Sequence, residues 1–266
     1  LGNEFFSKWL DKSLTYSSAI YEDQNESLEK AQRNKYQKLI DLLKIKEGNK
    51  VLEIGCGWGG FSEYLAKNYN VSIDCITISK KQFEFSKNRI SAAGLDNKVN
   101  VKFLDYRDVK EKYDNIASIE MIEAVGENYL DKYFGTIKNS LKSNGTAAIQ
   151  GITISDNLFE RYRGSEDFIQ KYIFPGGFLP SEKFMRQLIK KHNLSLNTIN
   201  SYSDDYAKTL NIWKSNFLNV WKNISSLGFD DTFKRMWEFY LSYCEAGFKS
   251  KNINLIQFSM SNKQIV

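Results

Sequence analysis

The sequence predicts an α/β fold in which helices cover a mostly parallel sheet, and three observations lead to this prediction. An apolar run at 51–54 stops at a cluster of glycines, and a helical pattern follows at once. Further apolar runs alternate with helical patterns over 71–149. Polar side chains fall where several of these runs end, and ligands of such sheets bind at the carboxyl ends of the strands.

The length and composition indicate one globular domain over 1–266. The 266 residues suffice for a substantial core, and the hydrophobic (42%) and charged (26%) fractions are ordinary. No apolar run approaches the about 18 residues that a membrane span needs, and no secretory signal is visible. The chain opens on Leu1 rather than methionine, which is compatible with a fragment of a longer protein.

The cysteines, the histidine and the net charge limit which kinds of catalysis, metal site and binding partner are expected. Cys56, Cys75 and Cys244 are odd in number and lack metal-ligand spacing, which suits a reducing cytosol. His192 is the single histidine, so histidine catalysis and histidine-rich metal sites are nearly excluded. The net charge of +5 is spread along the chain. It indicates either a lysine-rich solvated surface or attraction to anionic lipid, at about 1 kcal/mol per basic residue. No motif for nucleic-acid binding is present.

The glycine cluster is the most informative stretch. Gly55, Gly57 and Gly60 satisfy G-x-G-x-x-G between a predicted strand and a predicted helix, where bare backbone amides face a ligand. Alone, this pattern fits a dinucleotide site, or a turn that binds nothing. Glu53 stands two residues before the first glycine, where it can accept hydrogen bonds from an ammonium group. This placement favours S-adenosylmethionine (SAM) over a dinucleotide.

The elements along the chain follow from periodicity. Apolar residues at three- to four-residue spacing predict helices, and short apolar runs bounded by turn residues predict strands. Helices are expected over 28–43, 61–66 and 80–93 and from about 129, and strands over 51–54, 71–76, 99–104, 116–119, 145–149 and 253–260. Asp74 lies near the spacing of a ribose-binding acid, but it precedes the strand end by two or three positions, so we interpret it as structural.

Two later segments interrupt this alternation. Residues 155–180 are rich in Phe, Tyr and Arg and close with both prolines of the chain, and we expect a mostly irregular lid or binding loop there. Residues 212–248 predict two aromatic-rich helices. Their aromatic stripe fits an ordinary core, or the wall of a long apolar cavity for an alkyl substrate.

The loop at 54–60 resembles the nucleotide loop of the cyclopropane-fatty-acyl-phospholipid synthase family, the mycolic acid cyclopropane synthase-like SAM-dependent methyltransferases. Five other segments match the family in the same order, so the resemblance covers almost the whole chain. They are residues 16–19, 77–79, 122–126, 172–177 and 206–210.

The resemblance implies a Rossmann-like class I SAM-dependent methyltransferase fold. Such a fold has a seven-stranded, mostly parallel sheet, an antiparallel final strand and an α-helical acceptor-binding insertion. Residues 1–25 would fold over the cofactor, and 155–180 and 205–249 would cap the acceptor site. The resemblance also implies contacts between SAM and a set of residues from four parts of the chain. They are Tyr16, Ser17, Glu53, Gly55, Gly57, Gly59, Thr77, Ile78, Gln82, Tyr106 and Arg107.

The implied reaction adds a methyl or methylene group to the cis double bond of an unsaturated fatty-acyl chain on a phospholipid. Closing a cyclopropane ring requires a base, and the family uses bound bicarbonate for this purpose. The residues implied to hold it here are Glu123, Tyr206, Gln150 and the backbone of Ser18 and Ile152.

Two positions, Gln150 and Cys244, affect which product and which base the resemblance implies. Gln150 stands where many members have histidine; glutamine can donate a hydrogen bond but does not titrate. A methyl or methylene branch therefore stays open as the product. Cys244 falls where members commonly have cysteine, and it is either a thiolate base or a small buried residue.

Two other functions are considered. Small-amine N-methyltransferases share this fold, but they tend to carry histidine where this chain has Ala124. A SAM- or lipid-binding protein without activity is disfavoured because Glu53, Glu123 and Tyr206 are all present. The expected setting is the cytoplasm, with peripheral contact to an anionic membrane. A homodimer is compatible with the resemblance, and nucleic acid is not an expected partner.

Overall fold

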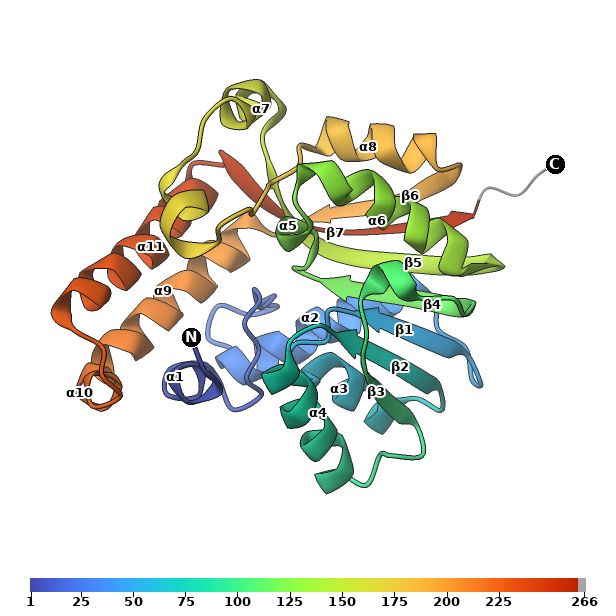
Figure 1. Ribbon diagram of the computed structural model, residues 1–266, viewed down its shortest axis with the longest axis horizontal. Coiled ribbons are helices and arrows are strands. Elements are labelled where there is room, and N and C mark those ends of the chain that lie inside the picture. The colour runs from blue at the N-terminus through green and yellow to red at the C-terminus, as the bar shows by residue number, and fades with distance from the viewer. Residues whose placement is uncertain (263–266) are drawn as a thin grey trace.

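The structure is a computed structural model that describes residues 1–262, and it contains a seven-stranded sheet with helices on both faces (Figure 1). The strand order is β3-β2-β1-β4-β5-β7-β6. Strand β7 runs antiparallel to both of its neighbours, β5 and β6, and all the other described strand pairs are parallel. The strands are β1 (Lys50–Ile54), β2 (Ser72–Thr77), β3 (Val99–Phe103), β4 (Tyr113–Ile119), β5 (Leu141–Ile154), β6 (Leu194–Ser201) and β7 (Ile253–Asn262). The predicted fold class is confirmed.

Helices cover both faces of the sheet and form a cap beside it (Figure 1). On one face lie α2 (Leu28–Leu43), α3 (Gly60–Asn68) and α4 (Lys80–Ala92); on the other lie α6 (Glu127–Ser140) and α8 (Glu182–Lys191). The shorter elements are α1 (Asn3–Ser7), η1 (Tyr106–Asp108), α5 (Ile122–Val125), α7 (Asp156–Arg163), η2 (Ile169–Ile173) and α10 (Trp221–Ser225). The cap is built on α9 (Ser203–Asn219) and α11 (Asp231–Lys249), which pack against each other.

The aromatic stripe of 212–248 is mainly core. Trp213 and Phe217 are fully buried, and both belong to one cluster with Phe5 and Trp9 from the N-terminal segment. The Phe5 ring lies 5.2 Å from the Trp237 ring, so residues far apart in the chain share this core. The N-terminal segment is thereby fixed between the sheet and the cap helices.

The expectation of an irregular segment over 155–180 is wrong in part. Helix α7 and the π-helical turn η2 lie within it. Ser155 and Gly164 flank α7 as its caps, so local signals for this helix are present. The strand β6 and the helix α8 were not predicted. β6 is an edge strand whose side chains are mostly half-buried or exposed, so its apolar pattern is weak.

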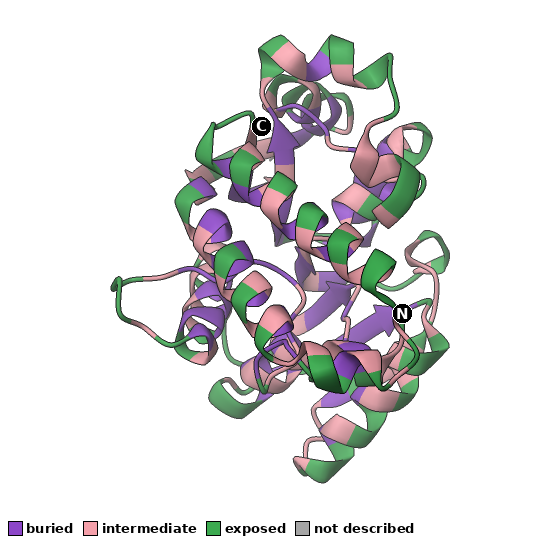
Figure 2. Ribbon diagram, turned by 90° about the vertical axis from the view of Figure 1, so that its left-hand side faces the viewer, coloured by how far each residue is buried: buried purple, intermediate pink, exposed green. Residues whose placement is uncertain are grey.

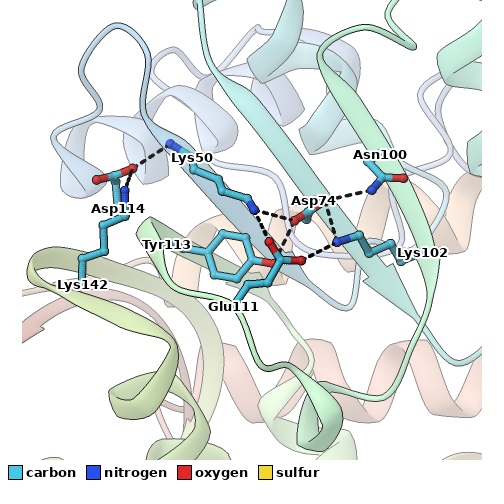
Figure 3. Close-up of polar contacts among 8 residues, drawn as sticks. All are labelled: Lys50, Asp74, Asn100, Lys102, Glu111, Tyr113, Asp114 and Lys142. Carbon is cyan, nitrogen blue, oxygen red and sulfur yellow. Dashed lines mark hydrogen bonds and ion pairs between the residues drawn. The ribbon is translucent and has the colours of Figure 1, made fainter.

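Asp74 is structural, as predicted. Its carboxylate accepts a hydrogen bond from the Tyr113 hydroxyl (2.8 Å) and from the Asn100 amide (3.1 Å), and it pairs with Lys102 (3.0 Å). Figure 3 shows this cluster, which Lys50 joins from β1. With these partners the Asp74 carboxylate is occupied by the protein itself, and it does not line the cavity described next.

Candidate functional site

A cavity of about 750 Å³ lies at the carboxyl ends of β1, β2 and β4, beneath the N-terminal segment. This volume is within the range of small-molecule and cofactor sites. All but one of the predicted cofactor residues line it: Tyr16, Ser17, Glu53, Gly55, Gly57, Thr77, Ile78, Gln82, Tyr106 and Arg107. The tertiary structure therefore brings together four segments that the sequence treats separately.

Gly59 is the predicted cofactor residue that does not line the cavity. It is the N-cap of α3 and has a φ of 80°, a conformation that favours glycine. A Cβ atom there would lie 3.2 Å from the Ser86 side chain on α4. Gly59 thus shapes the turn and lets two helices approach, rather than facing a ligand.

Glu53 places a buried carboxyl group at the wall of the cavity. It lies in β1 and is 3% exposed, and the Ser62 hydroxyl on α3 donates a hydrogen bond to it. Burial raises the pKa of Glu53 to about 7, although the Ser62 contact lowers it. A bound ammonium group would restore the charged carboxylate, so this wall fits the amino-acid end of SAM.

The other end of the cavity is a shaped, partly open mouth. The Thr77 hydroxyl donates to the Gln82 side-chain oxygen (3.1 Å), which ties the end of β2 to α4. The Arg107 guanidinium donates two hydrogen bonds to the Asp105 carboxylate (2.9 and 2.7 Å). Ile78 is exposed at this mouth. Polar and apolar edges of this kind suit a flat, hydrogen-bonding base such as adenine.

Glu120 is the residue that sequence reasoning missed. It directly follows β4, has a φ of 46°, and lines the cavity. Its carboxylate accepts three hydrogen bonds: from the Ser18 backbone N–H (2.8 Å), the Gln150 amide (2.8 Å) and the Tyr206 hydroxyl (2.6 Å). These three groups were expected to hold a bicarbonate ion, and in the structure they hold a carboxylate of the protein.

Burial and the neighbouring groups have opposite effects on the pKa of Glu120. Burial raises the pKa of the Glu120 carboxyl, whereas Tyr206, the nearby Lys35 cation, Gln150 and the Ser18 N–H lower it. Burial also raises the pKa of Tyr206 well above its usual value, so the hydroxyl stays a donor. A carboxylate whose pKa is raised within a buried site is a stronger base than an exposed one.

A second layer of hydrogen bonds orients the donors to Glu120. The Gln257 side-chain amide on β7 donates to the Gln150 side-chain oxygen (2.9 Å) and to the Lys35 carbonyl (3.1 Å). The Gln150 oxygen is therefore occupied, and its NH₂ group faces Glu120. The Lys35 ammonium donates to the Ser17 hydroxyl (2.6 Å), which supports the backbone that carries the Ser18 N–H.

Glu123 lies beside this centre but makes different contacts. One carboxyl oxygen accepts a hydrogen bond from the Ile152 N–H. The other oxygen is buried and has no partner within the described chain. Burial, with the neighbouring Glu120 charge, raises the pKa of Glu123 to about 8, so Glu123 carries a proton near neutral pH. Neither Glu123 nor Ile152 lines the cofactor cavity.

Cys244 does not have the properties of a base. Burial raises the pKa of its thiol to about 12, and the Asp167 carboxylate adds to this effect. A thiolate is therefore strongly disfavoured at neutral pH. Cys244 is half-buried and packs against the aromatic core of the cap, which favours the interpretation as a small packing residue over that as a base.

Aromatic rings of the cap pack behind Tyr16, which lines the cavity. The Tyr16 hydroxyl is hydrogen-bonded to the Tyr240 hydroxyl of α11 (2.8 Å). The Tyr16 ring lies 5.3 Å from the Trp213 ring, and Tyr206 stacks on Phe248 at 4.3 Å. Tyr206, which donates to Glu120, and Tyr16, which lines the cavity, thus belong to one aromatic cluster with residues of the cap.

Comparison with known proteins identifies the family. The sequence model described as mycolic acid cyclopropane synthetase matches residues 1–258. The chain belongs to this family. It is 37% identical over 268 residues to the tuberculostearic acid methyltransferase UfaA1 of Mycobacterium tuberculosis, covering 98% of this chain and 62% of that protein. It is 36% identical over 261 residues to the cyclopropane-fatty-acyl-phospholipid synthase of Escherichia coli K12, covering 98% and 65%.

The chain thus spans slightly less than two thirds of these two relatives. Among solved structures, the fold is similar to mycolic acid cyclopropane synthase CmaA1 complexed with SAH and CTAB. The TM-score is 0.90 at 25% identity, with 97% of this chain and 94% of that chain covered. The class I SAM-dependent methyltransferase fold that the sequence predicts is confirmed by this similarity and by the strand order.

Proposed function

We propose that the protein is a SAM-dependent methyltransferase that converts the cis double bond of an unsaturated fatty-acyl chain, carried by a phospholipid, into a cyclopropane. The observation that carries this proposal is the Glu120 carboxylate, which three donors hold at the wall of the cofactor cavity. A base in an aromatic pocket beside a methyl donor is what this reaction requires. Its lipid acceptor agrees with the names of the relatives.

The residues of the cavity fit SAM. Glu53 would offer a buried carboxylate to the ammonium group, the Gly55 and Gly57 backbone would allow close approach, and the mouth near Ile78 and Tyr106 would take the adenosine. When bound, SAM supplies an electrophilic methyl group to the alkene, which leaves a positive charge on the acyl chain. The solved structure of CmaA1 is a complex with SAH, the demethylated product of SAM.

Glu120 is proposed as the general base. After methyl addition, its carboxylate takes one proton from the added carbon, and the electrons of that C–H bond close the three-membered ring. Tyr206 and Gln150 keep the carboxylate in place through hydrogen bonds. The rings of Tyr16 and Trp213 exclude water from the charged acyl chain.

The expected bicarbonate does not fit this donor set. The Ser18 N–H, Gln150 and Tyr206 all donate to Glu120, and the Ile152 N–H donates to Glu123. A bicarbonate ion at this place would find the three donors already bonded to Glu120. Its negative charge would also lie beside the Glu120 carboxylate, and two neighbouring like charges repel each other. We therefore propose that the Glu120 carboxylate, rather than a bound bicarbonate, is the base.

Replacing Glu120 tests this assignment. Glu120→Gln keeps the shape and removes the base, so we expect the rate to fall by about 10²–10⁴. Labelled SAM and vesicles of unsaturated phospholipid provide the assay, with lipid mass spectrometry detecting the about 14 mass units of an added methylene. SAM affinity, measured by calorimetry, should change by less than about threefold.

Glu120→Gly supplies the matching test. Because Glu120 has a positive φ, glycine is tolerated there, and its three donors become free. We expect this variant to depend on added bicarbonate, while the wild-type rate is equal in buffer stripped of carbon dioxide. A bicarbonate-dependent wild type together with a fully active Glu120→Gln enzyme would show that the assignment is wrong.

A methyl or methylene branch is the second candidate product. The similarity to a tuberculostearic acid methyltransferase at 37% identity favours it. A hydride shift from the methylated carbon to the neighbouring cation, followed by proton loss from the added methyl to the same base, gives the methylene branch. A saturated methyl branch requires in addition a separate hydride donor that reduces this methylene. Gas chromatography of the product distinguishes a ring from a branch. Label found only on small amines would instead support an N-methyltransferase.

The proposed setting is the cytoplasmic face of an anionic phospholipid membrane. The acceptor is a membrane lipid, so the enzyme must meet the bilayer surface. Across residues 1–262, no helix combines the length and the hydropathy that a membrane-spanning helix needs. Contact at the surface, rather than insertion of a spanning helix, is therefore proposed for these residues.

A further inference from the structure

The cap carries a patch of exposed aromatic side chains. We define the aromatic patch as Tyr172, Phe174, Phe239 and Tyr243, whose exposed fractions lie between 43% and 55%. The half-buried Phe168 ring joins its members, at 5.4 Å from Tyr172 and 4.7 Å from Phe239. These residues come from the segment around η2 and from α11, on the side of the molecule that faces the viewer in Figure 2.

Large exposed hydrophobic residues are otherwise rare on the described surface. Leu1, Ile78 and Tyr129 also belong to this set, and all three line the mouth of the cofactor cavity. Phe103 lies at the end of β3 beside the Phe83 ring. The aromatic patch is thus a cluster with no cofactor to cover it, and contiguous exposed apolar surface of this kind marks an interaction site.

Exposed cations accompany the aromatic patch. The Lys171 ammonium lies 5.4 Å from the centre of the Tyr172 ring. Arg235, Phe239 and Tyr243 follow one another at four-residue spacing on α11, so they share one helix face. Asp167, whose charge acts on Tyr243, accepts a hydrogen bond from the Gln170 backbone. Aromatic rings with neighbouring Lys and Arg are typical of surfaces that rest in the headgroup region of a bilayer.

The aromatic patch is also connected to the reaction centre. The Phe174 ring lies 5.9 Å from the Tyr240 ring, whose hydroxyl pairs with that of Tyr16 (2.8 Å). Tyr16 lines the cofactor cavity. A chain of three aromatic residues therefore runs from the exposed surface to the cofactor cavity.

We propose that the aromatic patch docks the protein on the surface of an anionic phospholipid bilayer, with Phe174 at the point where an acyl chain enters. The rings would lie among the headgroups, and Lys171 and Arg235 would meet lipid phosphates. The docking surface stands on its own observations, while the entry of an acyl chain rests on the proposed function.

Co-sedimentation with vesicles tests the docking surface in the absence of SAM. One vesicle type contains equal amounts of dioleoyl phosphatidylglycerol and phosphatidylcholine, and the other contains phosphatidylcholine alone. We expect the Tyr172→Ser/Phe239→Ser variant to lose at least about tenfold in partition to the anionic vesicles. Each cation at an anionic surface contributes about fivefold in partition. Lys171→Glu/Arg235→Glu should therefore lose about 25-fold or more, with little change on phosphatidylcholine.

The matched control is Phe103→Ser, which removes an exposed phenylalanine of similar exposure away from the patch. It should bind vesicles as the wild type does. SAM affinity measured by calorimetry must be retained in every variant, which shows that each is folded. Wild-type protein that fails to bind anionic vesicles, or patch and charge variants that bind as the wild type does, would overturn the proposal.

The outcome is separable from that of the proposed function. If no lipid product forms with any acceptor but vesicle binding still needs the aromatic patch, the proposed reaction fails and the docking surface stands. If lipid is modified while binding and turnover are equal in wild type and patch variants, the docking surface fails and the reaction stands.

Discussion

Glu120 shows how a single residue determines the chemistry of this site. Its backbone adopts a left-handed conformation that costs a non-glycine residue about 1 kcal/mol or more. The conformation directs the carboxylate at three donors that come from residues 18, 150 and 206. Strain of this kind persists where surrounding contacts impose it, and such positions cluster at active sites.

The fall of the rate on the acid side of the pH–rate profile should reflect the pKa of the Glu120 carboxyl group. The base must be ionised, and burial raises the pKa of this carboxyl. We expect the rate to fall with decreasing pH at values clearly above those of an exposed glutamate, which titrates near 4.3. Initial rates from pH 5 to 9 at saturating SAM provide the measurement. A rate that stays constant down to about pH 4.5 would contradict the role of Glu120.

Gln257 is predicted to act through Gln150. In Gln257→Leu the Gln150 oxygen loses its donor, and the amide becomes free to turn away from Glu120. We expect the rate to fall by about tenfold, the order expected when a buried hydrogen-bond partner is removed. The acid limb should also move to higher pH, because Glu120 loses a hydrogen bond that lowers its pKa.

The control for this prediction is Ser259→Ala, a buried position two residues further along β7. It should leave both the rate and the acid limb unchanged. Calorimetry should give equal SAM affinities for all three proteins. If Gln257→Leu lowers the rate without moving the acid limb, Gln257 supports packing only.

At the scale of elements, two glycines on either side of β1 show two different needs for glycine. Gly57 and Gly48 both have positive φ (52° and 76°), and neither has an atom within 4 Å of a built Cβ. Gly57 lines the cofactor cavity, whereas Gly48 precedes β1 and does not. The pair therefore distinguishes the conformational need for glycine from the need for close approach to a ligand.

Alanine at either position should lower the free energy of unfolding by a similar amount, about 1 kcal/mol. We expect SAM affinity to fall by at least about tenfold in Gly57→Ala and to stay unchanged in Gly48→Ala. Urea unfolding and calorimetry provide the two measurements. Equal SAM affinity in both variants would show that SAM does not approach this turn.

At the scale of the whole molecule, the buried ionisable groups link stability to pH. Burial raises the pKa of Glu53 to about 7 and that of Glu123 to about 8, so the folded state binds more protons than the unfolded state from about pH 4.5 upward. Stability contributed by these groups is lost as the pH rises to about 8. Burial lowers the pKa of Lys35 to about 7, which makes the folded state bind fewer protons up to about pH 10.5.

The free energy of unfolding without SAM should therefore pass through a minimum near pH 7 to 8. Glu123→Gln keeps an acceptor for the Ile152 N–H and removes one titrating group, so the fall between pH 5 and 8 should become smaller. Urea unfolding at several pH values tests both statements. Stability that rises steadily from pH 5 to 8 in the SAM-free protein would contradict the raised carboxyl pKa values.

The sequence by itself determined the parts of this protein that depend on local pattern. The strand, glycine turn and helix around Glu53 are contiguous, so periodicity and glycine spacing sufficed to predict them and the SAM site. The motifs indicated which family the chain belongs to, and the comparison with the family model confirmed it. The edge strand β6 escaped prediction because its half-exposed side chains leave a weak apolar pattern. The helices α7 and α8 were also missed, although Ser155 and Ser181 stand at their N-caps.

Only the tertiary structure shows which group accepts hydrogen bonds from the predicted donors. Ser18, Gln150 and Tyr206 come from the N-terminal segment, β5 and α9, and no local pattern shows that their polar atoms converge on Glu120. The motif at 122–126 indicated Glu123, which lies three residues after Glu120 in the chain. The carboxyl group of Glu123 instead accepts a hydrogen bond from the Ile152 N–H. Spacing along a chain specifies local conformation, whereas a hydrogen-bonded centre depends on where distant backbones cross. The fold brings them together, and it makes a protein carboxylate the partner of donors expected to hold a free anion.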